Sequence, residues 1–451
     1  MSSEKSLGAF SDQAAAYVAQ VTQLLANESP LDTAQRIARL TAAHEMWRGR
    51  RALNLNAAEG VMSRGARRLL ASDLATRVSE GVPGDKLFPH ALQNRYIDEI
   101  EATLIAIARQ LFGAAHVEWR PLSTSMANAA VFSTLAQPGE VILVQPQDAG
   151  GNYSYNAAGF PPLIGLKVEP LPWTGSCFEL DVEAAAQEIR RLRPRLIVIG
   201  GSNVMFPYPV ADLRALADEV GAKLIYDAAH LGLLVATGVF QRPLEEGAHV
   251  MTISTHKIMG GAVGGMTLTN DAEIAAAISR TVFPPLLQTR DQNKYAATAY
   301  AFAEHLEFGA AHAAQIVANA QALGAAMLKA GFEVFGSERG FSRSHQVFVR
   351  DPAIAAAEFE ERCQRAQILA ARTARTAGVL GGKPGGVIRL SVQEITRQGL
   401  VEEDMPRVAQ LIADAVRLRR SAAEIGEEIA QWMGSLGPLR FSFDDRFGLS
   451  P

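Results

Sequence analysis

The residues best suited to chemistry lie in one stretch, His249 to Gly265, which reads HVMTISTHKIMGGAVGG. An apolar, β-branched run from Val250 to Ile253 predicts a short buried strand that leads into a glycine-rich turn. Lys257 stands in this turn, and open α/β sheets bind their ligands where strands end. A partly desolvated lysine there can lose its charge and become a nucleophilic amine. Two interpretations are open: a Schiff-base lysine carrying pyridoxal phosphate (PLP), or a surface lysine beside a flexible loop.

A carboxylate and a second imidazole follow another predicted strand. The run 223–226 leads into Asp227-Ala-Ala-His230, thirty residues before Lys257. A carboxylate leaving a buried strand needs a cationic partner, and a protonated pyridine nitrogen is one that keeps a PLP ring an electron sink. The alternative is that Asp227 caps a helix and His230 fills the helix start.

Hydroxyl groups precede a predicted helix further upstream. Ser123, Thr124 and Ser125 stand just before it, and Ser202 follows two glycines at another strand end. Hydroxyls and free backbone amides at a helix N-terminus suit a phosphate group. An ordinary Ser/Thr cap would look the same in the sequence.

An arginine interrupts an apolar strand near the C-terminus. Arg389 stands in the run Val-Ile-Arg-Leu at 387–390. Because arginine is rarely buried unpaired, we expect a carboxylate partner. An amino-acid substrate or an internal Asp or Glu would serve equally well.

The elements that position these residues alternate between strand-like and helical patterns. Such alternation predicts an α/β fold with a mostly parallel sheet wrapped by helices. A long helical stretch at 294–330 then leads to a second group of strand-like runs. The strand-like runs are 117–119, 141–144, 196–199, 224–226, 250–253, 333–335, 346–349 and 387–390. The loop at 79–90 is rich in glycine and proline, and we expect no regular structure there.

The domain organisation follows from these patterns and from the length of 451 residues, which exceeds one ordinary domain. The prediction is an N-terminal helical arm (1–50), a large domain (51–300), a smaller C-terminal α+β domain with its linking helix (301–420) and a tail (421–451). The arm could pack on a partner subunit.

Charge and composition exclude several classes of partner. The 43 basic and 47 acidic side chains give a net charge of −4, so nothing favours nucleic acid or an anionic membrane. The chain has no apolar run of membrane-spanning length and no apolar signal core. The two cysteines, Cys177 and Cys363, have neither metal nor redox spacing, so we expect no bound metal and a cytoplasmic protein with reduced thiols.

Together these motifs resemble those of the serine hydroxymethyltransferase family, over roughly residues 50 to 420. Their order and spacing agree throughout, which is more specific than any one motif. The resemblance implies PLP fold type I, with a large domain built on a mostly parallel seven-stranded sheet. The motifs that carry it are SEGVPG at 79–84, STSMAN at 123–128, DAAH at 227–230, STHK at 254–257 and IRLSVQEITR at 388–397.

The resemblance also implies roles for individual residues. Lys257 would hold PLP, Asp227 would bind the pyridine nitrogen, and His230 would lie near the ring oxygen. Arg389 would grip the substrate carboxylate, and Glu80 would be an acid/base group reaching across a homodimer interface. A dimer of dimers stays an alternative. The remaining cofactor contacts would come from Ser123, Thr124, Ser125, Thr255 and His256 at the phosphate end, and from Ser202 near the ring.

Several positions depart from the family pattern. The loop at 378–386 is also shorter than the segment that contacts folate in the family. Because each departure removes a hydrogen bond or a stacking contact, we expect that tetrahydrofolate is not required. The departures are Val78 and Phe88 for tyrosines, Asn152 for the histidine that stacks on the ring, Val263 for an arginine, and Ala58 for the serine that helps bind the substrate carboxylate. Tyr153 or Tyr155 could supply an aromatic face in place of that histidine.

The predicted activity is making or breaking the Cα–Cβ bond of a β-hydroxy amino acid. A base such as Glu80 or His230 would remove the β-hydroxyl proton, releasing an aldehyde and leaving a glycine quinonoid. This predicts a hydroxymethyltransferase, or a folate-independent aldolase or transaldolase acting on serine or threonine. The alternatives are another reaction at the α-carbon (racemisation, decarboxylation or transamination) and a PLP-binding protein with reduced catalysis.

Overall fold

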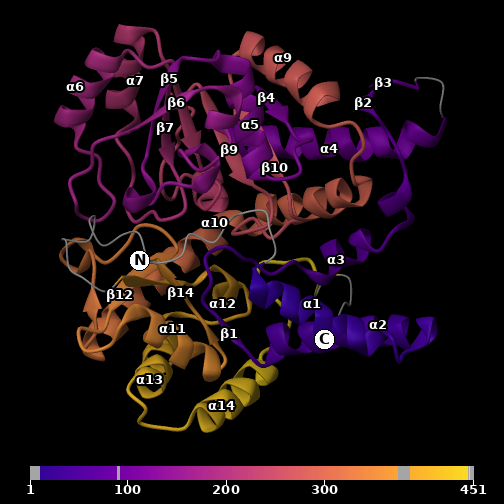
Figure 1. Ribbon diagram of the computed structural model, residues 1–451, viewed down its shortest axis with the longest axis vertical. Coiled ribbons are helices and arrows are strands. Elements are labelled where there is room, and N and C mark those ends of the chain that lie inside the picture. Colours follow the sequence, from indigo (N-terminus) through magenta and orange to yellow (C-terminus); the bar gives the residue numbers. More distant parts are fainter. Residues whose placement is uncertain (1–10, 89–91, 374–385, 445, 447–451) are drawn as a thin grey trace.

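The computed structural model describes residues 11–88, 92–373, 386–444 and 446 of the chain. Two sheets dominate it. A seven-stranded sheet with helices on both faces lies at one end, a four-stranded sheet lies at the other, and α10 passes between them (Figure 1). In the described residues, no helix is long and apolar enough to cross a membrane.

The seven-stranded sheet has the order β4-β10-β9-β8-β7-β5-β6. The four pairings from the edge strand β6 through β9 are parallel, and β10 runs antiparallel to both of its neighbours. β5, β7, β8 and β9 are nearly continuous apolar runs because both faces of the sheet are covered. The strands are β4 (His116–Glu118), β5 (Val141–Val144), β6 (Lys167–Pro170), β7 (Leu196–Gly200), β8 (Lys223–Asp227), β9 (Val250–Ser254) and β10 (Gly265–Thr269).

Alternate residues of each strand pack into two different cores. Leu196 and Val198 face the core formed with α5 and α9, whereas Ile197 and Ile199 face the core formed with the other helices. This period of two places one helical layer on each side of the sheet. The helices are α4 (Arg95–Phe112), α5 (Thr124–Leu135), α6 (Val182–Leu192), α7 (Val210–Val220), α8 (Gly232–Ala236) and α9 (Ala272–Thr281).

The second sheet is antiparallel, with the order β11-β12-β15-β14. It follows the 38-residue helix α10 (Gln292–Lys329). Its strands are β11 (Glu333–Val334), β12 (Gln346–Arg350), β14 (Ala371–Thr373) and β15 (Val387–Ser391). Its helices are α11 (Ala356–Arg365), α12 (Gln393–Arg397), α13 (Met405–Val416) and α14 (Ala422–Ser435).

The N-terminal helices lie on the outside of the molecule. α1 (Asp12–Leu25) and α2 (Pro30–Arg50) bury no residue, although they carry apolar side chains such as Leu31 and Leu40. The chain then forms β1 (Leu53–Asn54), which pairs in parallel with β13 (Ile368–Leu369), and α3 (Arg64–Leu70). An amphipathic helix pair with an uncovered apolar face is the form expected of an arm that packs on another surface.

The predicted fold class is confirmed, and two details need correction. β6 and β10 did not stand out in the sequence, because β6 is mostly exposed and β10 begins within the glycine-rich turn. The loop at 79–90 was expected to lack regular structure, but β2 (Gly81–Val82) and β3 (Asp85–Lys86) form a short hairpin in it. Gly84, with φ +75°, makes the turn that closes this hairpin. The division into four domains stays a prediction.

Candidate active site

The turn between β9 and β10 presents Lys257 at the carboxyl end of the parallel strands. Its side chain is mostly buried, which lowers its pKa from 10.5 to about 8; nearby Arg389 lowers the pKa further and Asp227 opposes the shift. A side chain at Gly60 would collide with the backbone oxygen of Lys257, so the segment before α3 packs directly on this turn. The lysine therefore holds a far less basic amine than a surface lysine does.

Asp227 ends β8 and is 1% exposed. Its carboxylate accepts hydrogen bonds from the backbone N–H of Ala229 at 2.9 Å and from Nδ2 of Asn128 at 3.1 Å. Burial raises its pKa, against these hydrogen bonds and the nearby Lys257. The helix-cap alternative is wrong for this residue, because α8 begins only at Gly232 and has no side-chain cap. A buried carboxylate without a described ion-pair partner calls for a cation or a proton donor.

Asn128 is a further candidate site residue, which belongs to the motif at 123–128 but had no predicted role. It is fully buried in α5; its Oδ1 accepts from Thr252 Oγ1 at 2.8 Å, and its Nδ2 donates to Ser154 Oγ at 3.0 Å as well as to Asp227. Both ends of the amide are thus fixed, and Asn128 aims the carboxylate of Asp227. The available signal was an asparagine inside the apolar face of a helix.

Three neutral imidazoles surround the lysine and the aspartate. Burial, Lys257 and Arg389 hold the pKa of His230 well below its usual range, and burial lowers that of His256 to about 4. His345, on the loop before β12, stacks on His230 with ring centroids 6.2 Å apart and planes 12° apart, and burial lowers its pKa to about 3. The Nδ1 atoms of all three have no partner among the described residues. Nothing in the sequence pattern pointed to His345.

The three hydroxyl residues predicted to line the phosphate end lie at the N-terminus of α5. Ser123 caps this helix by accepting from Met126 N–H at 3.2 Å, and Thr124 shares a hydrogen bond with Ser254 at 2.6 Å. Ser125 is exposed, whereas Thr255 is buried and donates to the carbonyl of Ala262 at 2.6 Å. Ser123 is therefore an ordinary helix N-cap, as the alternative interpretation of this motif expected, because its side-chain oxygen accepts a hydrogen bond from the first turn of α5.

Asn152 and Ser202, on the loops that follow β5 and β7, are hydrogen-bonded to each other. Asn152 Nδ2 donates to Ser202 Oγ at 2.9 Å, and its Oδ1 accepts from Ser154 N–H at 2.9 Å. Tyr155 is fully buried with its hydroxyl bound to Gly200 O at 2.7 Å, while Tyr153 is more than half exposed. Asn152, at the position where the family pattern has a histidine ring, is therefore a polar residue that is hydrogen-bonded to Ser202.

Arg389 is buried without a carboxylate among the described residues. Its Nη1 donates to Ser202 O at 2.7 Å and to Asn203 Oδ1 at 3.2 Å, and its Nε has no described partner. Burial lowers its pKa to about 10, so the group still carries its charge at neutral pH. No internal acid pairs with Arg389 among the described residues, and binding of a substrate carboxylate by this guanidinium stays a prediction.

For two predicted site residues, Glu80 and Ala58, the described hydrogen bonds lead to residues outside this cluster. Glu80 precedes the β2–β3 hairpin, and its carboxylate contacts Thr289 Oγ1 at 3.5 Å. Ala58 is exposed, with its N–H bound to Asn56 Oδ1 at 3.0 Å. The loop at 378–386, predicted to be shorter than in the family, lies outside the described residues except for its last residue, Gly386.

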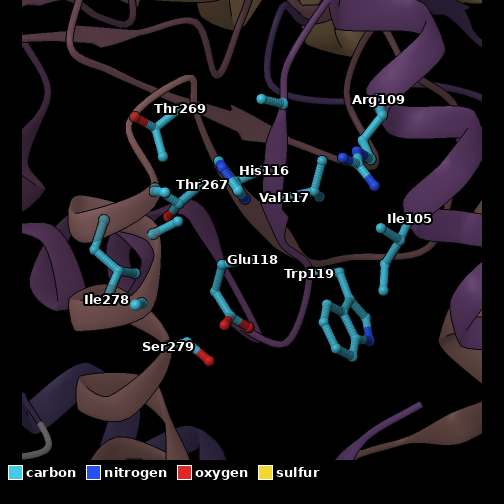
Figure 2. A pocket seen from close by; sticks show the side chains of 14 residues that line it. Ile105, Arg109, His116, Val117, Glu118, Trp119, Thr267, Thr269, Ile278 and Ser279 are labelled. Atoms are coloured by element: carbon cyan, nitrogen blue, oxygen red, sulfur yellow. The ribbon is translucent and has the colours of Figure 1, made fainter. Parts of the chain in front are cut away.

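A separate cavity of about 370 Å³ lies away from this cluster, at the edge strand β4 between α4 and α9. Figure 2 shows Val117 and Trp119 turned toward α4 and its Arg109, while His116 and Glu118 turn toward β10 and α9. Glu118 is paired with Arg120. None of the predicted site residues lines this cavity, so it is separate from the candidate active site.

The residues of the cluster fit PLP. A lysine of lowered pKa, a buried aspartate, a helix N-terminus with hydroxyls and several unsatisfied buried polar atoms converge at one edge of the sheet. The lysine suits the aldehyde of this cofactor, the aspartate suits its ring nitrogen, and the helix N-terminus suits its phosphate. Fold and site together therefore define a PLP-dependent enzyme of fold type I.

Comparison with known proteins identifies the family. The serine hydroxymethyltransferase family model matches residues 32–412, and the chain belongs to this family. It is 35% identical over 425 residues to a serine hydroxymethyltransferase of Methanosphaera stadtmanae, covering 92% of this chain and 97% of that protein. It is 37% identical over 417 residues to an alpha-methylserine aldolase of Variovorax paradoxus, covering 91% and 92%.

A solved structure of a related enzyme has the same fold. The crystal structure of L-threonine transaldolase from Pseudomonas fluorescens superposes with a TM-score of 0.84 at 26% sequence identity, covering 95% of this chain and 96% of that one. The predicted family, fold type and class of enzyme are thus confirmed. The residue roles stay predictions.

Proposed function

We propose that this enzyme makes and breaks the Cα–Cβ bond of β-hydroxy amino acids as an aldolase or transaldolase that does not require tetrahydrofolate. The observation that carries the proposal is the buried guanidinium of Arg389, which has no carboxylate partner among the described residues. It lies close enough to Lys257 and His230 to lower the pKa of both. A substrate that brings a carboxylate to Arg389 places its amino group and α-carbon near Lys257.

The residues around Lys257 divide the work of the reaction. Arg389 binds the carboxylate through charge-assisted hydrogen bonds and fixes the orientation of the α-carbon. Asp227, aimed by Asn128, would hold a proton on the pyridine nitrogen of bound PLP. When bound, PLP supplies an electron sink for the pair left on the α-carbon. Lys257, with its lowered pKa, provides an amine that is neutral in a substantial fraction at mildly alkaline pH.

The bond between Cα and Cβ breaks when a base accepts the proton of the β-hydroxyl. The hydroxyl carbon becomes an aldehyde, the electron pair stays on Cα, and a proton later added to Cα gives glycine or its α-substituted analogue. His230 is one candidate base, because it is neutral and its Nδ1 has no described partner. Glu80 from a partner subunit is the other.

Independence from folate is supported by two kinds of observation. Val78 and Phe88, at positions where the family pattern has tyrosine, and Val263, where it has arginine, are exposed in the single chain. The relatives also include proteins named as alpha-methylserine aldolases and an L-threonine transaldolase. Serine hydroxymethyltransferases are similarly close in sequence, so the hydroxymethyltransferase reaction is the alternative to test.

We further propose a cytoplasmic homodimer with shared active sites. α1 and α2 bury none of their residues within the chain, and the hydrogen bond described for the Glu80 carboxylate goes to Thr289 and to no residue of the lysine cluster. A two-fold partner would cover the apolar face of the arm and supply the missing carboxylate. The two cysteines are buried free thiols, which suits a reducing compartment.

The test is to mix the PLP-loaded enzyme with L-serine, L-threonine or α-methyl-L-serine and to measure aldehyde release, with and without tetrahydrofolate. The proposal expects release from at least one of them without folate, and none from a Lys257→Ala control. Release that requires folate would establish the hydroxymethyltransferase alternative. No aldehyde under either condition would overturn the proposal in favour of another reaction at the α-carbon.

A further inference from the structure

The C-terminal segment of residues 437–444 and 446, called here the C-terminal strap, packs along α10 and α3. Its backbone and side chains meet several buried polar groups: Arg440 N–H donates to Arg397 O at 2.8 Å, and Phe443 N–H donates to Glu304 Oε1 at 3.1 Å. Arg446 pairs with Glu307 at 2.6 Å on the surface of α10. The strap is thus tied to the molecule through charged groups that the reaction does not use.

The first line of contacts from the strap reaches the lysine turn through an ion pair. Glu304 and Arg397 are both buried and bind each other, and Glu304 also receives the N–H of Phe443. The guanidinium of Arg397 donates to Val61 O at 2.9 Å and lies so close to Gly260 that a side chain there would collide with it. Gly260, with φ +57°, is three residues after Lys257.

A second line of contacts runs through stacked rings. The ring of Phe441 stacks on His312 at 4.7 Å and 13°, and His312 stacks on His305 at 6.0 Å and 25°. His305 hydrogen-bonds through Nε2 to the carbonyl of Met259 at 2.8 Å, two residues after Lys257. Burial lowers the pKa of His305 to about 3, and a carbonyl only accepts, so Nε2 carries the proton of the neutral ring.

A third line of contacts holds the segment on the other side of the lysine. Asp444 is buried and accepts from the N–H groups of Arg64 and Gly65 at 2.9 and 3.0 Å, where α3 begins. The residues just before α3 include Gly60, whose backbone touches the carbonyl oxygen of Lys257. The strap therefore fixes both backbone segments that enclose the lysine turn.

We propose that His305 and the Glu304–Arg397 pair are positioning residues for Lys257, and that the C-terminal strap holds them in place. His305 fixes the carbonyl of Met259, Arg397 fixes Gly260, and Asp444 holds the segment that packs on Lys257 itself. The turn then offers the lysine amine in one direction before any ligand arrives. This inference does not depend on which α-carbon reaction the enzyme performs.

The test measures the turn directly, by hydrogen exchange of the full-length protein without cofactor. The amide of Gly260 donates to His256 O and Lys257 O, and the amide of Gly261 donates to Thr255 O at 2.8 Å, so both report on the turn. In His305→Leu, which loses the donor, we expect these amides to exchange about tenfold faster. His305→Gln keeps a donor at similar reach and should restore slow exchange.

Two further variants separate positioning from general destabilisation. His312 has no described hydrogen-bond partner, so His312→Phe keeps the ring stack and is the matched control, with exchange within about twofold of the parent. Asp444→Asn weakens the buried attachment of the strap to the start of α3. It should speed exchange of the same two amides while amides of α7 stay unchanged. Unchanged exchange at Gly260 and Gly261 in both His305→Leu and Asp444→Asn, or equal acceleration in α7, would overturn the proposal.

Discussion

Gln346 and Arg389 bind the same backbone oxygen: Nε2 of Gln346 and Nη1 of Arg389 both donate to the carbonyl of Ser202, at 3.1 and 2.7 Å. Gln346 also accepts the N–H of Val204 at 3.0 Å. These residues stand on adjacent strands of the smaller sheet, while Ser202 follows β7 of the larger one. Gln346 therefore ties the two sheets together at the acceptor that orients the candidate carboxylate-binding arginine.

Replacing Gln346 should separate substrate binding from catalysis. Gln346→Met keeps the size of the side chain but removes both hydrogen bonds, so Ser202 and Arg389 lose a fixed relative position. We expect the KM for the amino acid to rise about tenfold with kcat changed less than about threefold. Steady-state kinetics with the active amino acid test this; a lowered kcat at unchanged KM would contradict it.

Removing Arg389 should weaken substrate binding without unfolding the protein. In the described residues it has no carboxylate partner, so Arg389→Met removes a buried charge that nothing compensates. We expect amino-acid affinity to fall about 100-fold while Tm stays the same or rises. Affinity is measured by spectral titration of the PLP-loaded enzyme and Tm by thermal unfolding.

Arg397→Met is the matched control for this variant. Arg397 is equally buried but paired with Glu304, so its loss should cost about 3–5 kcal/mol of unfolding free energy. A comparable loss in Arg389→Met would mean that Arg389 has a structural partner, and the substrate role would lose its main support.

The lowered pKa of Lys257 predicts a specific pH dependence. The rate at which the cofactor-free protein takes up PLP should rise with pH to a plateau, with a midpoint near the lysine pKa of about 8. Asp227 opposes and Arg389 adds to the lowering of that pKa. Asp227→Asn should therefore shift the midpoint to lower pH, and Arg389→Met should shift it to higher pH.

The lowered pKa of Lys257 also makes the stability of the folded protein depend on pH. The dependence is opposite to that of a salt-bridged lysine, whose pKa is raised by folding. The folded pKa of about 8 lies below the ordinary value of 10.5, so between these values the unfolded chain binds more protons. The free energy of unfolding of the cofactor-free protein should rise with pH across this window, relative to Lys257→Met. Denaturant titrations at several pH values give this difference, and parallel pH profiles for the two proteins would count against a buried, uncharged amine.

Shared active sites in a homodimer predict complementation between two inactive variants. With Glu80 as the base, the Lys257→Ala and Glu80→Gln proteins should each be inactive, yet a heterodimer of the two contains one site with both native residues. Random exchange of equal amounts should recover about a quarter of the parent activity. The measurement is activity after joint unfolding and refolding, with each variant refolded alone as the control. A mixture as inactive as its components would refute sharing of Glu80 across the interface.

Much of the fold could be predicted because its signals are local. β5, β7, β8 and β9 are short apolar runs, and α4 and α10 show helical spacing with recognisable ends. β10 escaped because its first residue belongs to a glycine-rich turn, and the hairpin at Gly81–Lys86 escaped because glycine and proline suggested only a loop. In both cases the pairing partner, not the local pattern, makes the strand.

The sequence by itself determined the chemical groups and the order in which they occur: Lys257 after one strand, Asp227 after another, Arg389 inside a third. Strand ends and residue types are local properties, so these positions could be read without a structure. Only the tertiary structure decided that Arg389 has no described carboxylate, that His345 stacks on His230, that Asn128 aims Asp227, and that Glu80 stands apart in a single chain. These contacts join residues roughly a hundred or more positions apart, and they depend on how two sheets and a long helix pack, which no local spacing encodes.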